Sequence, residues 1–343
     1  MKSDKKMMEK DVHEAVVEGF EFVEAPRVSP EGDVWFSDLT GGGVYRKRIG
    51  EAVETMLPGR LWVGGIVFDR SGKVLCSGKG GIVALDPGTG AVKTVLDTLE
   101  DKPIVAVNDM EGDGRGGFFA GTIDFDAILA RGETPQPGQF FHMSAEGKIT
   151  ILRRDVFATN GIALSPCGRW LYHSETSKGI WRYPVGSDGL PGDGTLLAPL
   201  EDSDGLALDA DGCLWVACWA SGTLVRLSPD GEQLSEQSYG FPHLVSLAFD
   251  CVDPRRLYVS TGGNADAPAK GGVIAINLDV EGLCGAPTSL DFLGGVSLTA
   301  TRLRMTRRSL EAAGLSPQPS ATRPRRPSGG SYRSVDRRGG VRN

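Results

Sequence analysis

Several sequence features that would suggest other kinds of protein are missing from this 343-residue chain. No apolar run of 18 residues occurs, so no transmembrane helix is predicted and no membrane partner is expected. The N-terminus, MKSDKKMMEK, lacks the apolar stretch of a secretory signal. No GxSxG motif opens a helix after a strand, which argues against a serine nucleophile elbow. The six cysteines contain no CxxC pair, and we predict free thiols in a cytoplasmic protein.

Acidic residues outnumber basic ones outside the C-terminal end. The formal net charge is −7, but residues 296–343 carry eleven Arg and only two acids, a local +9 that leaves −16 for the rest. An acidic body argues against nucleic acid as the partner and is compatible with binding a cation. We predict a disordered lead over residues 1–11 and a basic, disordered tail over residues 295–343. The oligomeric state is not indicated.

Glycine is abundant, with 48 residues, many of them in Asp-Gly or Ser-Gly turns between short apolar runs. The pattern is clearest in residues 202–231, DSDGLALDADGCLWVACWASGTLVRLSPDG, where strands alternate with turns. It recurs six times with a period of roughly 40–50 residues, which is typical of one four-stranded propeller blade per copy. We therefore predict an all-β, six-bladed β-propeller over residues 12–294, closed by an N-terminal strand within residues 12–23.

One long insertion interrupts the third unit. Residues 123–139, IDFDAILARGETPQPGQ, form a segment much longer than a hairpin turn, with a helix-like piece at 125–130. Loops of this length in a compact ring are usually functional or disordered. We interpret the segment as a lid over one mouth of the central channel, with a disordered excursion as the alternative.

Oxygen-bearing residues recur at the start of the first strand of the units. The first strands of propeller blades line the channel, so residues at this position should form a ring at one of its ends. Carboxylate and amide oxygens suit a hard divalent cation, and the lack of His argues against a nitrogen- or sulfur-ligated zinc site. Singly, each residue could merely form a turn. The position, called here the start column, is occupied in the six units by Glu24, Gly64, Asn108, Asn160, Asp204 and Ser246.

Four motifs in this order resemble the signatures of the gluconolactonase, regucalcin and luciferin-regenerating-enzyme family. The resemblance spans about residues 12–292 and implies a six-bladed propeller with one divalent metal in the channel, many members being lactone hydrolases. It implies that Glu24, Asn160 and Asp204 hold the metal and that Asn108 contacts substrate and water. We expect Ca²⁺, with Zn²⁺, Mn²⁺ or Mg²⁺ as alternatives. The motifs are EAP at 24–26, ND at 108–109, NGIALSP at 160–166 and DGLALD at 204–209.

The chain departs from this pattern beside Asn108. Sugar-lactone members carry Arg two residues earlier, where this chain has Ala106. Because Ala cannot donate the fork of hydrogen bonds that Arg offers to a polyol, a less polar lactone or ester is expected as the substrate. Trp62 is a candidate pocket wall, and His243 is a candidate substrate contact at the channel rim.

These residues suggest a mechanism. A bound cation polarises the carbonyl, Asp204 acts as the general base that takes a proton from water, and Asn108 is the orienting hydrogen-bond donor. The sequence therefore predicts a metal-dependent hydrolase of lactones or related esters. The alternative is a non-catalytic propeller that binds calcium or a small ligand.

Overall fold

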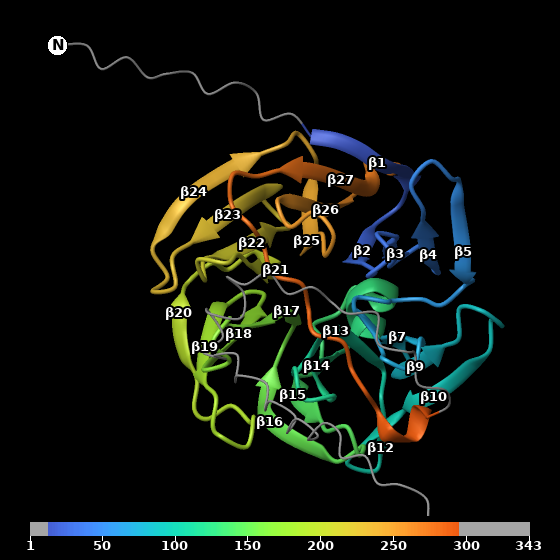
Figure 1. Cartoon of the computed structure of the whole chain (residues 1–343), viewed down its shortest axis with the longest axis vertical. Coiled ribbons are helices and arrows are strands. Elements are labelled where there is room, and N and C mark those ends of the chain that lie inside the picture. The colour runs from blue at the N-terminus through green and yellow to red at the C-terminus, as the bar shows by residue number, and fades with distance from the viewer. Residues whose placement is uncertain (1–12, 295–343) are drawn as a thin grey trace, which may run out of the picture.

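Six sheets are arranged radially around a common centre in the computed structural model, which describes residues 13–294 (Figure 1). This arrangement confirms the predicted all-β propeller of six blades. No helix in the described part of the chain is long and apolar enough to cross a membrane. The predicted lead and basic tail, residues 1–11 and 295–343, lie outside the described residues.

Each blade is an antiparallel sheet whose first strand is innermost. Blade 1 has β2 (Val23–Val28), β3 (Val34–Asp38), β4 (Val44–Lys47) and β5 (Val53–Leu57); blade 2 has β6 (Ile66–Phe68), β7 (Val74–Cys76), β9 (Ile82–Leu85) and β10 (Val92–Leu96); blade 3 has β13 (Ala106–Gly112), β14 (Phe118–Ile123), β15 (Gly138–Met143) and β16 (Ile149–Val156).

The second half of the ring repeats this order. Blade 4 has β17 (Thr159–Leu164), β18 (Trp170–Glu175), β19 (Gly179–Pro184) and β20 (Thr195–Ala198); blade 5 has β21 (Ser203–Leu208), β22 (Leu214–Cys218), β23 (Thr223–Leu227) and β24 (Gln233–Ser238); blade 6 has β25 (His243–Phe249), β26 (Arg256–Gly262), β27 (Gly271–Asn277) and β1 (His13–Phe20). Short elements between them are β8 (Gly78–Lys79), β11 (Thr98–Leu99), β12 (Lys102–Pro103), the π-helix η1 (Asp126–Arg131) and the 3₁₀ helix η2 (Asp291–Leu293).

The N-terminal strand closes the ring, as predicted. Strand β1 pairs antiparallel with β27, with His13 opposite Ile276, and so becomes the outermost strand of blade 6. Two segments more than 250 residues apart thus share one sheet, and this pairing covers an edge that would otherwise be open to other chains.

Apolar side chains fill the space between neighbouring blades. The inner strands have neighbours on both faces, and β13 is buried at every position. Burying a polar group costs free energy unless it is hydrogen-bonded or meets a ligand. Polar residues on the inner strands therefore need an explanation. The largest fully buried side chains in the described residues include six phenylalanines, Phe36, Phe118, Phe119, Phe140, Phe141 and Phe249.

After β27 the chain crosses one face of the ring as a segment that we call the strap, residues 278–294 (orange in Figure 1). The backbone N–H of Leu283 donates to the carbonyl of Leu208 (2.9 Å), and that of Ala286 donates to Oε1 of Glu111 (3.2 Å). Thr288 donates through Oγ1 to Asp69 (2.8 Å). These partners lie at the C-terminal ends of inner strands in blades 5, 3 and 2, so the strap lies at that end of the channel.

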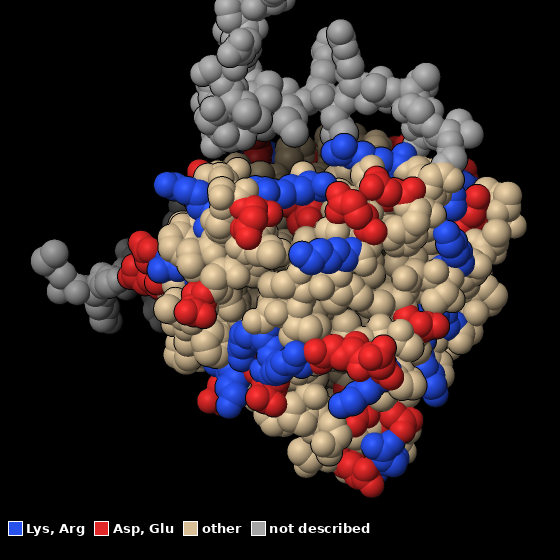
Figure 2. All heavy atoms as spheres, turned by 90° about the horizontal axis from the view of Figure 1, so that it is seen from below, with Lys and Arg blue, Asp and Glu red and all other residues tan. Residues whose placement is uncertain are grey.

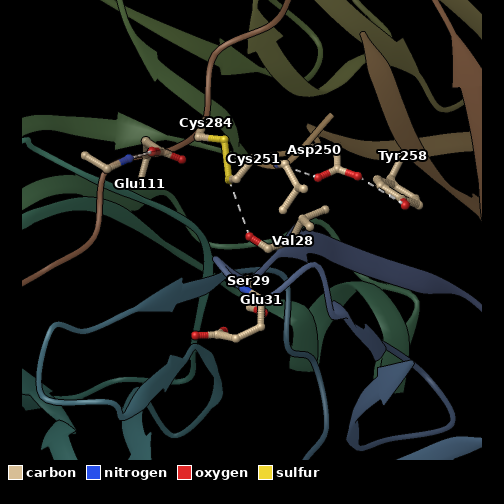
Figure 3. Close-up of a disulfide and its surroundings, with 10 residues drawn as sticks. Val28, Ser29, Glu31, Glu111, Asp250, Cys251, Tyr258 and Cys284 are labelled. Carbon is tan, nitrogen blue, oxygen red and sulfur yellow. Dashed lines mark hydrogen bonds between the residues drawn. A yellow bond between two sulfur atoms is a disulfide. The ribbon is translucent and has the colours of Figure 1, made fainter. Parts of the chain in front are cut away.

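A disulfide between Cys251 and Cys284 joins the strap to blade 6, with the two Cα atoms 5.5 Å apart (Figure 3). The prediction of six free thiols is therefore wrong for this pair and confirmed for Cys76, Cys167, Cys213 and Cys218. The pairing depends on the strap folding back over the ring, which cysteine spacing does not reveal. It removes the cysteine-based argument for a reducing compartment.

Candidate metal and substrate site

Four polar members of the start column lie on inner strands of four different blades: Glu24 on β2, Asn108 on β13, Asn160 on β17 and Asp204 on β21. All four are buried, Glu24 being 5% and Asp204 7% exposed. The structure thus brings the predicted metal-ligating residues together at the end of the channel opposite the strap.

The carboxyl groups at this end act on one another. Burial raises the pKa of Glu24 well above its usual range, and repulsion from Asp204 and Asp109 raises it further. Burial also raises the pKa of Asp204, with Asp109 the strongest repelling neighbour. The pKa of Asp109 is raised to about 7, again by burial, although Arg27 opposes that change. Each carboxyl would ionise more readily beside an added positive charge.

Arg27 is a half-buried cation three residues after Glu24. Its guanidinium donates to the carbonyls of Ile66 (3.0 Å) and Met110 (3.1 Å) and forms a 3.0 Å ion pair with Glu111. Sequence reasoning missed both Arg27 and the repulsion that involves Asp109. A signal for Asp109 was present in its position next to Asn108, whereas nothing in the repeat distinguishes Arg27.

The two amides are oriented by a chain of hydrogen bonds. Asn108 donates from Nδ2 to Oδ1 of Asn160 (2.5 Å) and to the carbonyl of Thr159 (2.8 Å). Asn160 donates from its own Nδ2 to Oγ1 of Thr176 (2.5 Å), which donates to the carbonyl of Ser203 (2.6 Å). The network points the side-chain oxygen of Asn160 toward Asn108. It engages the Nδ2 group of both amides as a donor.

The oxygen atom of the Asn108 side chain is buried and has no hydrogen-bond partner within residues 13–294. Since Nδ2 is already engaged, the free group of Asn108 is an acceptor, not the donor that the sequence predicts. A buried acceptor without a partner costs free energy. It therefore marks a place where water or a ligand can donate a hydrogen bond.

Two backbone features shape the column. A Cβ on Gly64 would lie 1.9 Å from Oδ1 of Asn108, so this member of the column is a close approach and not a ligand. Ala25, next to Glu24, has a left-handed φ of 50°, and its N–H donates to the Glu24 carboxylate (3.2 Å). Such a conformation costs free energy in a residue other than glycine and is enriched at functional sites.

Glu24, Asn160 and Asp204 fit a hard divalent cation as a donor set. They offer oxygen atoms only, and the two carboxyls are buried and repel each other. Within residues 13–294, no three His, Cys, Asp or Glu side chains gather closely enough to hold a metal by themselves. A site with three protein ligands here would therefore have to include the amide oxygen of Asn160.

The predicted pocket wall lies under the inserted segment. Trp62 and Ala106 belong to one apolar cluster, and the Phe125 ring lies 6.1 Å from that of Trp62. Helix η1 follows Phe125 and lies near the centre of the ring in Figure 1. Its range differs by one residue from the helix-like piece predicted at 125–130. Ala106 is fully buried, so a ligand reaches it only if this cover moves.

His243 begins β25 and is half-buried at the same end of the channel. Its Nδ1 lies 2.6 Å from the carbonyl of Trp219, its ring stacks on the Trp219 indole at 5.5 Å, and Phe22 lies 5.8 Å away. Trp219 is 39% exposed. Nδ1 of His243 therefore has a backbone partner, whereas Nε2 forms no hydrogen bond within residues 13–294.

Comparisons with known proteins agree with the fold. The family described as "SMP-30/Gluconolactonase/LRE-like region" matches residues 22–263. The 6-deoxy-6-sulfogluconolactonase of Pseudomonas putida is 31% identical, over 77% of this chain and 96% of its own length. A luciferin-regenerating enzyme superposes with a TM-score of 0.72 at 20% identity, covering 81% of this chain and 99% of that one. A calcium-binding regucalcin from Agrobacterium tumefaciens superposes with a TM-score of 0.70 at 23% identity, covering 80% and 97%. The chain belongs to the SMP-30/gluconolactonase/LRE-like family.

Proposed function

We propose that this protein hydrolyses a lactone or a related ester with one divalent cation held by Glu24, Asn160 and Asp204. The observation that carries the proposal is the group of buried, mutually repelling carboxyls beside an unpartnered acceptor on Asn108. Relatives named as lactonases support hydrolysis, and the regucalcin neighbour, named as calcium-binding, supports Ca²⁺ as the first cation to test.

The residues divide the work of the reaction. A bound cation supplies positive charge that polarises the ester carbonyl and offsets the buried carboxylates. Asp204 takes a proton from the attacking water, since a carboxylate in reach of that water is a competent general base. The free Oδ1 of Asn108 accepts a hydrogen bond from water or from a substrate hydroxyl and so orients it.

The substrate is proposed to be less polar than a sugar lactone where it faces Ala106. Trp62, Ala106 and Phe125 form an apolar wall there that offers no side-chain donor fork to hydroxyl groups. The Pseudomonas putida relative is named for a sulfonated sugar lactone, so sugar lactones belong in the same test. An Ala106→Arg variant should shift the preference toward gluconolactone, and Ala106→Met is the control for added volume without added donors.

A panel of apolar and sugar lactones, assayed with and without chelator, tests the proposal. We expect hydrolysis that disappears on chelation and returns with added Ca²⁺ or another divalent cation. Full activity in protein verified to be free of metal would contradict the metal-dependent route. Stoichiometric calcium binding without turnover of any lactone or ester would favour the alternative, a non-catalytic calcium-binding propeller.

A further inference from the structure

A two-residue strand is added to blade 3 at its innermost edge. Strand β8 pairs with the start of β13, with Lys79 opposite Ala106 and Gly78 opposite Val107. Strand β8 lies on the side of β13 away from β14. Lys79 faces Ala106, which comes two residues before Asn108 on β13. Lys79 is therefore at the same end of the channel as the start column.

The backbone around Lys79 is held from several sides. The Lys79 N–H donates to the carbonyl of Leu61 (3.0 Å). The half-buried guanidinium of Arg60 donates to the carbonyls of Ser77 (2.7 Å) and Gly81 (2.8 Å), which flank β8. Arg60 therefore holds the loop that carries Lys79 in place, and its Nε and Nη2 donors are used in these two hydrogen bonds.

The Lys79 ammonium lies 4.4 Å from the centroid of the Trp62 ring. Trp62 is itself fixed, with a left-handed φ of 63° and packing against Phe125 and Ala106. Lys79 is exposed and forms no ion pair within residues 13–294. By contrast, the Lys93 ammonium donates to the carbonyl of Phe292 (2.9 Å). A ring face attracts an ammonium but leaves its N–H donors for another acceptor.

We propose that Lys79 is a specificity-determining residue that binds an anionic oxygen group, such as a sulfonate or carboxylate, on the substrate. This inference rests on the proposed lactone hydrolysis and adds a substrate class to it. The carboxyls of Glu24, Asp109 and Asp204 disfavour an anionic ligand at this end of the channel. A fixed cation at the mouth attracts the anionic group and holds it away from those carboxyls.

The site has two parts that suit one ligand. Once the cover over it moves, the apolar wall of Trp62 and Ala106 takes the less polar part of the molecule, and the Lys79 ammonium beside it takes the anion. Because the Trp62 ring already restricts the lysine side chain, less conformational freedom is lost when the anion binds. Lys79 recognises the substituent and takes no part in the reaction at the carbonyl.

The test compares gluconolactone with its 6-deoxy-6-sulfo analogue, which differs by one anionic group. In Lys79→Met, which keeps an apolar side chain over Trp62, we expect kcat/KM for the sulfonated lactone to fall about tenfold, mainly through KM, as for loss of one charge-assisted contact. The value for gluconolactone should stay within about twofold, since it lacks the anion. Lys79→Arg should retain most of the preference for the sulfonated compound.

Lys93→Met is the matched control, because Lys93 also lies over an aromatic ring, Phe292 at 5.6 Å, but on the outer strand β10. We expect it to leave the ratio of the two lactones unchanged. Raising the ionic strength from about 0.01 M to about 1 M, which shortens the Debye length from ~30 Å to ~3 Å, should reduce the wild-type preference for the sulfonated lactone. In Lys79→Met, where only the repulsion by the carboxyls is left to screen, it should not reduce that preference.

Equal losses for both lactones in Lys79→Met, or no change in their ratio, would overturn the assignment of Lys79. If the wild type hydrolyses no lactone or ester of the panel, the proposed function fails; if it fails only on these two sugar lactones, the proposed function stands. In either case, calorimetric binding of the two sugar-acid products tests Lys79 by itself. Tighter wild-type binding of the sulfonated acid that is lost in Lys79→Met supports the assignment. Equal binding by the two proteins overturns it.

Discussion

The two ends of the inner strands contain similar residues in opposite electrostatic situations. A second set of polar residues lies four or five positions after the start-column residues, at the C-terminal ends of the inner strands. We call this set the end column. In the end column, Asp209 accepts hydrogen bonds from the backbone N–H groups of Asp211 (3.1 Å) and Cys213 (2.9 Å) and pairs with Arg226 at 2.6 Å. The end column consists of Ser29, Asp69, Asp113, Ser165, Asp209 and Asp250.

The pKa values separate the two columns. Hydrogen bonds from Ser71, Leu290 and Thr288 lower the pKa of Asp69 although burial opposes them. In the start column, burial and neighbouring carboxyls raise the pKa of Glu24 and Asp204 well above their usual range. Carboxylates on the outer surface also lie among Lys and Arg side chains on the face shown in Figure 2.

This difference shows which polar residues the fold itself explains. An end-column side chain closes the turn that follows its strand, so folding alone accounts for it. A start-column carboxyl closes no comparable turn and is instead destabilised by its neighbours. Groups that cost stability and persist are expected where function requires them.

The largest effect should come from Asp204→Asn. The substitution keeps the size of the side chain and one oxygen but removes charge and basicity. We expect kcat to fall by about 10²–10⁴, the usual cost of losing a general base, and not to recover when metal is saturating. Rate assays over a calcium titration check this. Near-normal turnover at saturating metal would make Asp204 a ligand only, and Asp109 and His243 would be the next candidates for the base.

The next effect is confined to the strap end. Cys251→Ser opens the loop closed by the disulfide to Cys284, 33 residues away, which should cost about 3 kcal/mol and lower Tm by about 5–10 °C. Because the strap lies at the opposite end from the start column, kcat/KM should stay within about twofold below the melting transition. Cys167→Ser, at an exposed free thiol, is the control. A large loss of activity without a loss of Tm would show that the two ends are coupled.

A smaller effect is expected for Glu24→Gln, which removes one carboxylate from the proposed ligand set. The affinity for Ca²⁺ should fall, by about ten- to a hundredfold, and much of the rate should return at high metal concentration. Calorimetric calcium titrations and rate assays at matched metal saturation measure the two parts. A rate that stays low at saturation would assign Glu24 a role beyond binding the cation.

The sequence predicts the blades well because each unit repeats the same pattern of strands and turns, and the column can be aligned on turn glycines. It does not predict the strap or the disulfide, which depend on where residues 278–294 lie after the last repeat. It identifies Asn108 as a site residue, but it does not predict that Nδ2 donates within the protein and leaves Oδ1 free. The hydrogen bonds to Asn160 and Thr159 form only when blades 3 and 4 pack together. The role of Lys79 likewise depends on the pairing of β8 with β13.

His173 is a polar group away from the channel that belongs to neither column. His173 is fully buried on β18, stacks on Phe140 at 4.3 Å, and has no hydrogen-bond partner for either ring nitrogen within residues 13–294. Burial lowers its pKa to about 3, and the nearby Arg153 adds to this. Tyr183, whose hydroxyl accepts a hydrogen bond from Arg153, also lies near the ring.

His173 and Asp109, the carboxyl next to the start column, should therefore affect stability with opposite dependence on pH. The unfolded chain protonates His173 near pH 6.5 and the folded chain only near pH 3, so stability falls as pH drops through this window, by about 1.4 kcal/mol per pH unit. Asp109, with its pKa raised to about 7, instead makes the metal-free protein less stable as pH rises from about 4 to about 7. Unfolding curves across pH should show His173→Leu flattening the acid limb with or without Ca²⁺. Added Ca²⁺ should relieve only the loss at higher pH, and relief of the acid limb by the metal would contradict the separation of the two regions.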